Sequence, residues 1–235
     1  MKSSPLVTII LTSHMKPTLR DALVSVDRQT FLSYECVVMD SGMWHGQNDS
    51  RSATMGAIYG DYEEDSRVTW ITTGEAPGLG DRVCPVAWAT NEAIRRGLVR
   101  GKYVCTFYDD DKYEPTFLER MVGYLEATGE QAVWCSQDRV RLLASGERQP
   151  AGQIRADRVL TPGSILNRVD GGQVMFTRDA LMQLGDPWLP EAPGGCLNSD
   201  GQFLERLCSL VGEIRPLDEM LYTHRFTPYS TYSPS

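Results

Sequence analysis

The chain has 235 residues, of which 41% are hydrophobic and 23% charged, proportions that support a sizeable buried core. Its formal net charge of −8 at pH 7 argues against a broad nucleic-acid-binding surface, and we expect no nucleic acid among its partners. No run of about 18 apolar residues occurs, so no transmembrane segment is predicted. The six scattered cysteines form no C-x-x-C pair, which favours reduced core thiols in a cytoplasmic protein.

The first elements alternate between strand and helix. The β-branched run 6–12 predicts a buried strand, and Pro17 opens a helix that ends near residue 30. Residues 34–39 predict a second strand, which Asp40 closes. A β-α-β unit of this length indicates a parallel sheet. The next expected elements are a short helix within 43–66, a strand at 68–71, a loop at 74–81, a helix at 86–98 and a strand at 103–107.

An acidic run, Tyr108-Asp109-Asp110-Asp111, follows the strand predicted at 103–107. Three adjacent carboxylates make a poor surface for folding but a good site for a hard cation. Oxygen ligands of this kind suit Mg²⁺ or Mn²⁺, and such a cation commonly bridges to substrate phosphates. Taken alone, the run is equally compatible with a solvated acidic turn before the next helix.

The pattern changes after residue 130. A helix from Pro115 to Gly129 ends the regular alternation. Beyond it we expect strands at 132–135 and 139–143 around a polar turn, and then a long excursion at 144–168. A strand at 173–177, a short helix ending at 185 and a Pro/Gly-rich loop at 187–197 should follow. The last expected elements are a helix opened by the capping box Ser199 and Gln202, a strand at 220–223 and a mobile tail at 224–235.

Polar residues end several of the predicted strands. In open α/β sheets, ligands bind beyond the carboxyl ends of the strands. This rule predicts that Thr12, Asp40 and residues 109–111 lie on one rim.

Four segments make the chain resemble a known family: V-T-I-I-L-T-S, S-V-D-R-Q-T-F, E-C-V-V-M-D-S-G and G-K-Y-V-C-T-F-Y-D-D-D-K-Y-E-P. They resemble the inverting nucleotide-sugar glycosyltransferases of the GT-A fold, family 2, and are similar to the spore-coat polysaccharide glycosyltransferases. The resemblance is specific over residues 5–135 and looser over 170–225. It implies an α/β GT-A fold with a mixed central sheet in a single domain, 1–235. A Rossmann-like nucleotide-sugar-binding half would span 1–112, and a smaller acceptor-binding half 113–235.

The resemblance also implies a reaction. The chain would move a sugar from a nucleoside diphosphate sugar to the hydroxyl of a sugar-containing or other hydroxylated acceptor, with Mn²⁺ or Mg²⁺ as cofactor. UDP, GDP and dTDP all stay open as the nucleotide, because the family often has two adjacent acids where this chain has Asp40 and Ser41. A homodimer is compatible with the sequence.

The resemblance implies roles in the nucleotide-binding half. Thr12, with the adjacent Ser13 and His14, would contact the nucleoside, and Asp40 would read the base. Arg82 would lie near the diphosphate, although a solvated arginine fits equally well.

Within the acidic run, counting back from Pro115 places Tyr108 where the family has its first acid. Asp110 then matches the direct metal ligand. Asp109 would orient the ribose or a metal-bound water, and Asp111 would support the site.

Asp200 matches the family's catalytic base, an acid that opens a helix about 90 residues after the metal ligand. The positive end of a helix favours an ionised carboxylate, and an anionic base can deprotonate a sugar hydroxyl. An ordinary acid in a first helical turn is the alternative.

The remaining candidates lie in the second half of the chain. His224 would complete a metal site, or Arg225 would neutralise the leaving group; a merely exposed pair is the alternative. Gly172 and Gln173 resemble a turn that faces the sugar and phosphate, although the glycine also suits a simple bend. The acceptor would contact Trp188, Glu191 and Asn198, and Trp188 fits a core position as well.

Three rival functions stay open. A sugar nucleotidyltransferase is disfavoured because Ser13-His14-Met15-Lys16-Pro17 contains no glycine where such enzymes carry a Gly-rich loop. A non-catalytic nucleotide-sugar-binding protein would not consume donor in the presence of acceptor. A retaining transferase of similar fold would give the opposite product stereochemistry.

Overall fold

The computed structural model describes residues 4–14, 16–40, 56, 58–73, 84–165, 168–186 and 199–227. Within these ranges, no helix has both the length and the apolar character needed to cross a membrane. The candidate residues Arg82, Trp188, Glu191 and Asn198 lie outside the described residues, as does Ser41.

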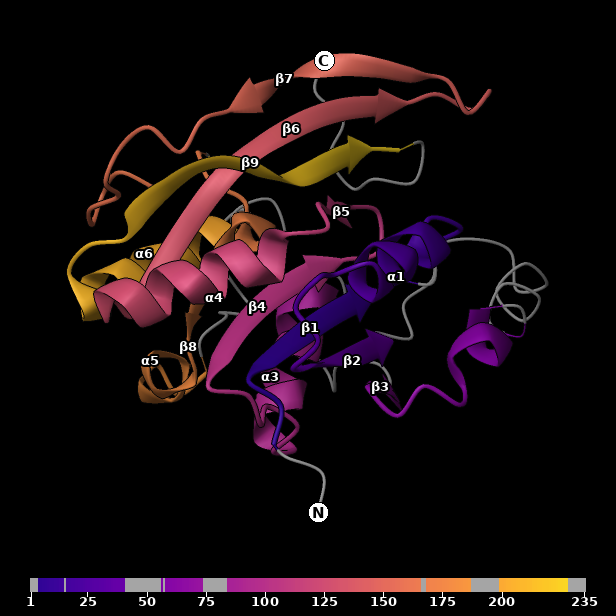
Figure 1. The fold of residues 1–235 in the computed structure, drawn as a ribbon, viewed down its shortest axis with the longest axis horizontal. Coiled ribbons are helices and arrows are strands. Elements are labelled where there is room, and N and C mark those ends of the chain that lie inside the picture. The colour runs from indigo at the N-terminus through magenta and orange to yellow at the C-terminus, as the bar shows by residue number, and fades with distance from the viewer. Residues whose placement is uncertain are drawn as a thin grey trace.

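The first half of the chain forms a parallel sheet, as the alternating pattern predicts (Figure 1). β1 pairs in parallel with both β2 and β4, and β3 pairs in parallel with β2. Because parallel strands run in the same direction, their carboxyl ends meet at one edge of the sheet. The elements are β1 (Val7–Ser13), α1 (Leu19–Asp27), β2 (Tyr34–Asp40), β3 (Val68–Thr72), α3 (Pro85–Arg95) and β4 (Tyr103–Tyr108).

The second half extends the same sheet with mixed pairing. β8 is antiparallel to both β4 and β6, whereas β9 is parallel to β6. Among the described strands, the order is β3-β2-β1-β4-β8-β6-β9-β5, with β7 paired to β6. The elements are β5 (Lys112–Tyr113), α4 (Phe117–Thr128), β6 (Ala132–Leu142), β7 (Arg148–Ile154), the 3₁₀ turn η2 (Gly171–Gln173), β8 (Val174–Thr177), α5 (Arg178–Gln183), α6 (Ser199–Val211) and β9 (Arg215–Phe226).

Three sequence predictions for this half are wrong. The two strands expected at 132–135 and 139–143 form one continuous strand, β6, because the polar residues between them pair with β9. The expected excursion contains β7, whose antiparallel partner is β6. The residues 224–226, expected to belong to a mobile tail, form the end of β9.

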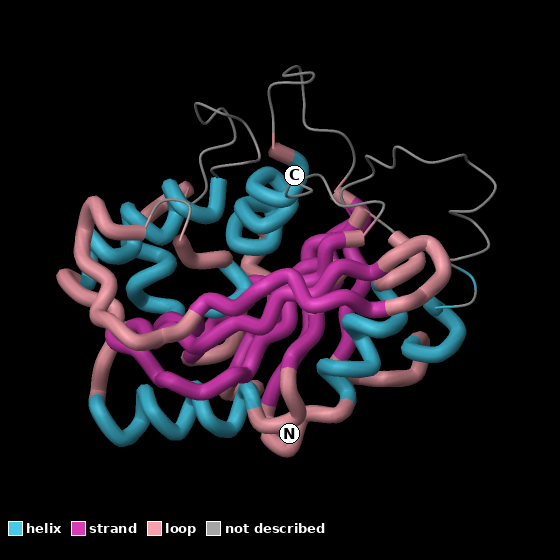
Figure 2. The backbone as a smooth tube through the Cα atoms, turned by 90° about the horizontal axis from the view of Figure 1, so that it is seen from above, coloured by secondary structure: helices cyan, strands magenta, loops and turns pink. Residues whose placement is uncertain are grey.

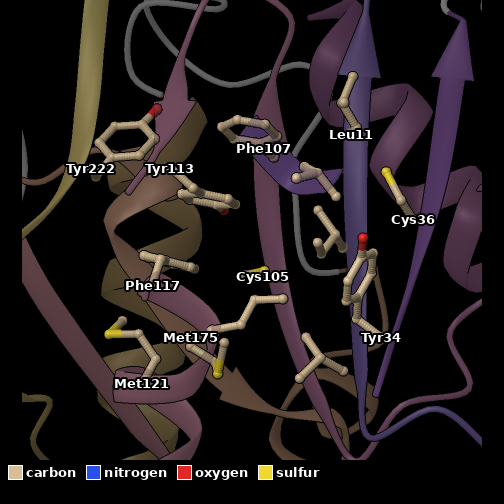
Figure 3. Close-up of a cluster of buried hydrophobic side chains, with 14 of the residues drawn as sticks. Leu11, Tyr34, Cys36, Cys105, Phe107, Tyr113, Phe117, Met121, Met175 and Tyr222 are labelled. Carbon is tan, nitrogen blue, oxygen red and sulfur yellow. The ribbon is translucent and has the colours of Figure 1, made fainter. Parts of the chain in front are cut away.

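Helices cover both faces of the sheet (Figure 2). On one face, α1 and α4 bury apolar residues against the sheet in a core that includes Phe107, Tyr113 and Phe117 (Figure 3). The ring of Tyr113 stacks on Phe107 at 4.0 Å and on Phe117 at 3.8 Å, centroid to centroid. These stacked rings hold the segment after the acidic run against the sheet. On the other face, α3, α5 and α6 pack against a second core.

Cysteines contribute to both cores. Those that the structure describes as free are all buried: Cys36, Cys84, Cys105, Cys135 and Cys208.

Candidate active site

The rim predicted from the sequence forms where β1, β2 and β4 end side by side. Ser13 is the register partner of Asp40, and Thr12 is the register partner of Tyr108. Asp40 is 3% exposed. The hydroxyl of Thr12 donates to the backbone oxygen of Phe107 at 3.4 Å, so Thr12 helps to join β1 to β4.

Asp109 holds the chain segment that follows β1. One of its oxygens, Oδ2, accepts from the hydroxyl of Ser13 at 3.0 Å and from the backbone N–H of His14 at 2.7 Å. It also accepts from the backbone N–H of Lys16 at 3.3 Å. These three donors anchor the segment at the rim.

Lys16 places a buried cation between two of the three acids. Its Nζ lies 3.3 Å from Oδ1 of Asp109 and 2.7 Å from Oδ2 of Asp110. Burial lowers the pKa of Lys16, but the two carboxylates outweigh burial and raise the pKa above its ordinary value. Asp109 and Asp110 are therefore partly neutralised by the chain itself.

Asp111, which is fully buried, contacts the C-terminal strand β9. The hydroxyl of Tyr222 donates to Oδ2, and the backbone N–H of Arg225 donates to Oδ1 at 2.9 Å. Nδ1 of His224 lies 3.2 Å from Oδ1 of Asp111 and 3.3 Å from Oδ2 of Asp170. Burial lowers the pKa of His224, but Asp111 and Asp170 outweigh it and raise the pKa to about 10. The two acids thus favour the protonated form of His224.

Asp111, Asp170 and His224 form a cluster that could hold a metal ion. Among the described residues, one ligand atom from each lies within 4.8 Å of the other two. Two carboxylates and an imidazole suit Mn²⁺ well, and Mg²⁺ prefers the carboxylates. The donor set therefore fits the cation that the sequence predicts. The carboxylate of Asp110, predicted as the direct ligand, pairs instead with Lys16.

Asp170 immediately precedes the turn η2 and caps it. Its Oδ1 accepts from the backbone N–H of Gly172 at 3.2 Å, and its own N–H donates to the side chain of Gln173 at 3.0 Å. The amide of Gln173 donates in turn to the backbone oxygen of Cys135 at 2.7 Å. A side chain at Gly172 would overlap the ring of Tyr222. Gly172 and Gln173 thus hold Asp170 in place.

Asp200 lies in the first turn of α6, on the other side of the same turn. Its Oδ2 accepts from the hydroxyl of Tyr108 at 2.8 Å and from the backbone N–H of Gly171 at 3.3 Å. Burial and the negative charge of Asp200 raise the pKa of Tyr108 well above its usual range, so the phenol stays a donor. A single turn, residues 170–173, thus connects Asp200 to the Asp111–Asp170–His224 cluster.

Arg225 contributes to the structure beneath the site rather than to its surface. It is 1% exposed, and its guanidinium donates to Asp21 at 2.7 Å and to the backbone oxygen of Asp110. No sequence pattern indicates a role for Lys16 or Tyr222, which are far from the acidic run along the chain. Asp170 did have a signal, because it immediately precedes the two glycines at 171–172.

Comparisons with known proteins show the family of the chain. Residues 8–185, more than half of the chain, match the family model described as glycosyl transferase family 2. Protein CgeD of Bacillus subtilis (strain 168) is 30% identical over an alignment of 230 residues, and the match covers 95% of this chain and 51% of CgeD. The chain therefore spans about half the length of this relative.

Solved structures share the fold. The structure of S. aureus TarS residues 1–349 in complex with UDP-GlcNAc superposes with a TM-score of 0.65 at 15% identity, covering 94% of this chain and 58% of that one. The mannosyltransferase PcManGT from Pyrobaculum calidifontis, in complex with GDP-Man and Mn²⁺, gives 0.64 at 18% identity, covering 95% and 57%. The predicted fold is confirmed, and the chain belongs to glycosyl transferase family 2, with the GT-A fold.

Proposed function

We propose that this chain transfers a sugar from a nucleoside diphosphate sugar to an acceptor hydroxyl, with inversion at the anomeric carbon. The observation that carries the proposal is the turn 170–173, which contacts Asp200 through Gly171 and places Asp170 against His224. A proton acceptor and a group of cation ligands thus lie next to each other. Family membership and the ligands of TarS and PcManGT, UDP-GlcNAc and GDP-Man, support the same reaction class.

In the proposed reaction, Asp200 takes the proton of the acceptor hydroxyl. The acceptor oxygen forms a bond to the anomeric carbon while the bond from that carbon to the diphosphate breaks, so configuration inverts. The Tyr108 hydroxyl and the Gly171 N–H both donate to one oxygen of Asp200 and thereby orient the carboxylate. Both groups also stabilise its charged form.

Asp111, Asp170 and His224 would hold Mn²⁺ or Mg²⁺, with Asp110 as a further candidate ligand. When bound, such a cation supplies positive charge that stabilises the departing diphosphate. Ser13, His14, Asp40 and Asp109 would contact the nucleoside, since they lie on the rim where β1, β2 and β4 end. The identity of the nucleotide (UDP, GDP or dTDP), the nature of the acceptor and the homodimer stay predictions.

The two proposed halves of the single domain both contribute to the site. Asp109 and its neighbours come from 1–112, whereas Asp170, Asp200 and His224 come from 113–235. Bound donor would therefore be enclosed by the nucleotide half and by the half proposed to bind acceptor.

The test is a panel of UDP-, GDP- and dTDP-sugars, with and without Mn²⁺, read first by thermal shift and then by release of nucleoside diphosphate. We expect one nucleotide class to raise the melting temperature in the presence of Mn²⁺ and to be consumed when an acceptor is added. Binding without consumption across a range of acceptors would favour the non-catalytic sugar-nucleotide binder. The stereochemistry of the product, read by NMR at the anomeric proton, separates inverting from retaining transfer.

A further inference from the structure

Two polar side chains on β6 have buried atoms without a partner. Gln137 is fully buried, and neither its Oε1 nor its Nε2 has a hydrogen-bond partner among the described residues. Nε of Arg139, two residues later, is also buried and unpaired there. A buried polar group without a partner destabilises the folded protein. Groups left in this state are therefore expected to meet a ligand or a water.

Both side chains lie on the face of the sheet that carries the candidate metal ligands. In the parallel pair of β6 and β9, Gln137 is the register partner of Tyr222, and Arg139 is that of His224. Register partners in a sheet point to the same face. Tyr222 and His224 both contact Asp111, so Gln137 and Arg139 lie on the same face of the sheet as these contacts.

Arg139 adds a positive charge to this face of the sheet. Its register partner His224 contacts both Asp111 and Asp170 through Nδ1. A divalent cation held by these two acids, together with Arg139, would outweigh their negative charge, which favours an anionic ligand.

We propose that Gln137 and Arg139 form a phosphate-binding subsite beside the Asp111–Asp170–His224 cluster. The planar guanidinium of arginine suits phosphate oxygens, and the glutamine amide adds a further donor. Two sources could supply the phosphate: the diphosphate of the sugar donor, or a phosphate group on the acceptor. The proposal deepens the proposed function and rests on it for the identity of the substrate.

The first test replaces Arg139 with Gln and measures the binding of five compounds by calorimetry in Mn²⁺: UDP, GDP, dTDP, inorganic pyrophosphate and glycerol 3-phosphate. Arg148→Gln is the matched control, because Arg148 is an exposed arginine on the neighbouring strand β7. We expect Arg139→Gln to weaken binding about tenfold or more, and the control to leave it unchanged. Arg139→Lys keeps the positive charge but loses the planar guanidinium. Its affinity for these compounds is therefore expected to lie between that of Arg139→Gln and that of the control.

The compounds distinguish the sources. A selective loss for the nucleoside diphosphates and pyrophosphate assigns the subsite to the donor, and a selective loss for glycerol 3-phosphate assigns it to the acceptor. Unchanged affinity for all five would overturn the proposal. If the wild-type chain binds none of the nucleotides, the proposed function fails, while pyrophosphate and glycerol 3-phosphate still decide whether the subsite exists.

The second test replaces Gln137 with Met, which has a similar shape but no hydrogen-bonding groups. We expect the melting temperature of the free protein to stay the same or rise, because an unpaired amide is removed from the interior. The gain in melting temperature on adding the phosphate compound that the wild type binds should shrink. A lower melting temperature of the free protein with an intact ligand-induced gain would show that Gln137 serves the fold alone.

Discussion

Replacing Lys16 with Met removes the buried cation between Asp109 and Asp110. The side chains of Lys16 and Asp110 are each 9% exposed and that of Asp109 is 3% exposed, so solvent screens the interaction little. Breaking a buried ion pair by removing one partner costs roughly 3–5 kcal/mol. For a chain of this size, each kcal/mol shifts the melting temperature by about 2–4 °C, which predicts a fall of roughly 6–20 °C.

The assay is thermal unfolding in a chelator and again with Mn²⁺ added. The cation should restore more stability to Lys16→Met than to the wild type, because it can neutralise the two buried charges of Asp109 and Asp110 that the substitution leaves without Lys16. Lys102→Met is the control, since the ion pair of Lys102 with Glu126 is solvent-exposed and its loss should leave the melting temperature nearly unchanged.

The same reasoning predicts that the stabilisation provided by Lys16 hardly changes with pH around neutrality. A lysine whose pKa is raised on folding stabilises the protein fully below its unfolded pKa of about 10.4 and loses this effect only above that pH. The difference in melting temperature between variant and wild type should therefore stay constant between about pH 6 and 9. A melting temperature of Lys16→Met within 2 °C of the wild type, about the shift for 1 kcal/mol, would refute the role assigned to Lys16.

Three further predictions concern the site. Asp200→Asn should lower the rate of sugar transfer by about 100-fold or more with nucleotide affinity retained, and wild-type turnover would remove Asp200 from the role of base. Asp170→Asn should weaken Mn²⁺ binding about tenfold or more by calorimetry, whereas Asp110→Asn should weaken it less; the reverse order would favour the assignment made from the sequence. Gly171→Ala should slow transfer without unfolding the chain, because the added methyl group would overlap the Tyr108 hydroxyl and press on Asp200. Unchanged transfer kinetics in Gly171→Ala would show that this packing is unimportant. Gly123→Ala, at an exposed position of α4 with open space around it, is the control for substitution of a glycine.

The first half of the fold could be predicted well because three of its strands, β1, β2 and β4, are buried on both faces. Such strands read as continuous runs of β-branched and aromatic residues, and 6–12 and 103–107 both have this pattern. β7 could not be predicted, since its sequence R-Q-P-A-G-Q-I lacks apolar alternation and most of its residues are exposed. Its strand conformation depends on pairing with β6, which the local sequence does not encode.

The residues of the candidate site likewise divide into those with a local sequence signal and those without one. Asp40, Asp109 and Asp200 carry local signals, namely the end of a strand or the start of a helix. Lys16 and Tyr222 do not, because their contacts with the acidic run depend on topology and on distant packing. Whether each predicted residue has its assigned role is a matter for the experiments above.

The attachment of Asp111 to β9 has a consequence for the way the protein is made. Arg225 reaches back 204 residues to Asp21, and β9 inserts between β6 and β5. During synthesis, residues 1–112 leave the ribosome long before the acidic run can meet Tyr222 and His224. Until then Asp111 lacks its hydrogen-bond partners on β9, and one edge of β6 is unpaired. Slow closing of this long-range contact is expected to limit the rate of folding.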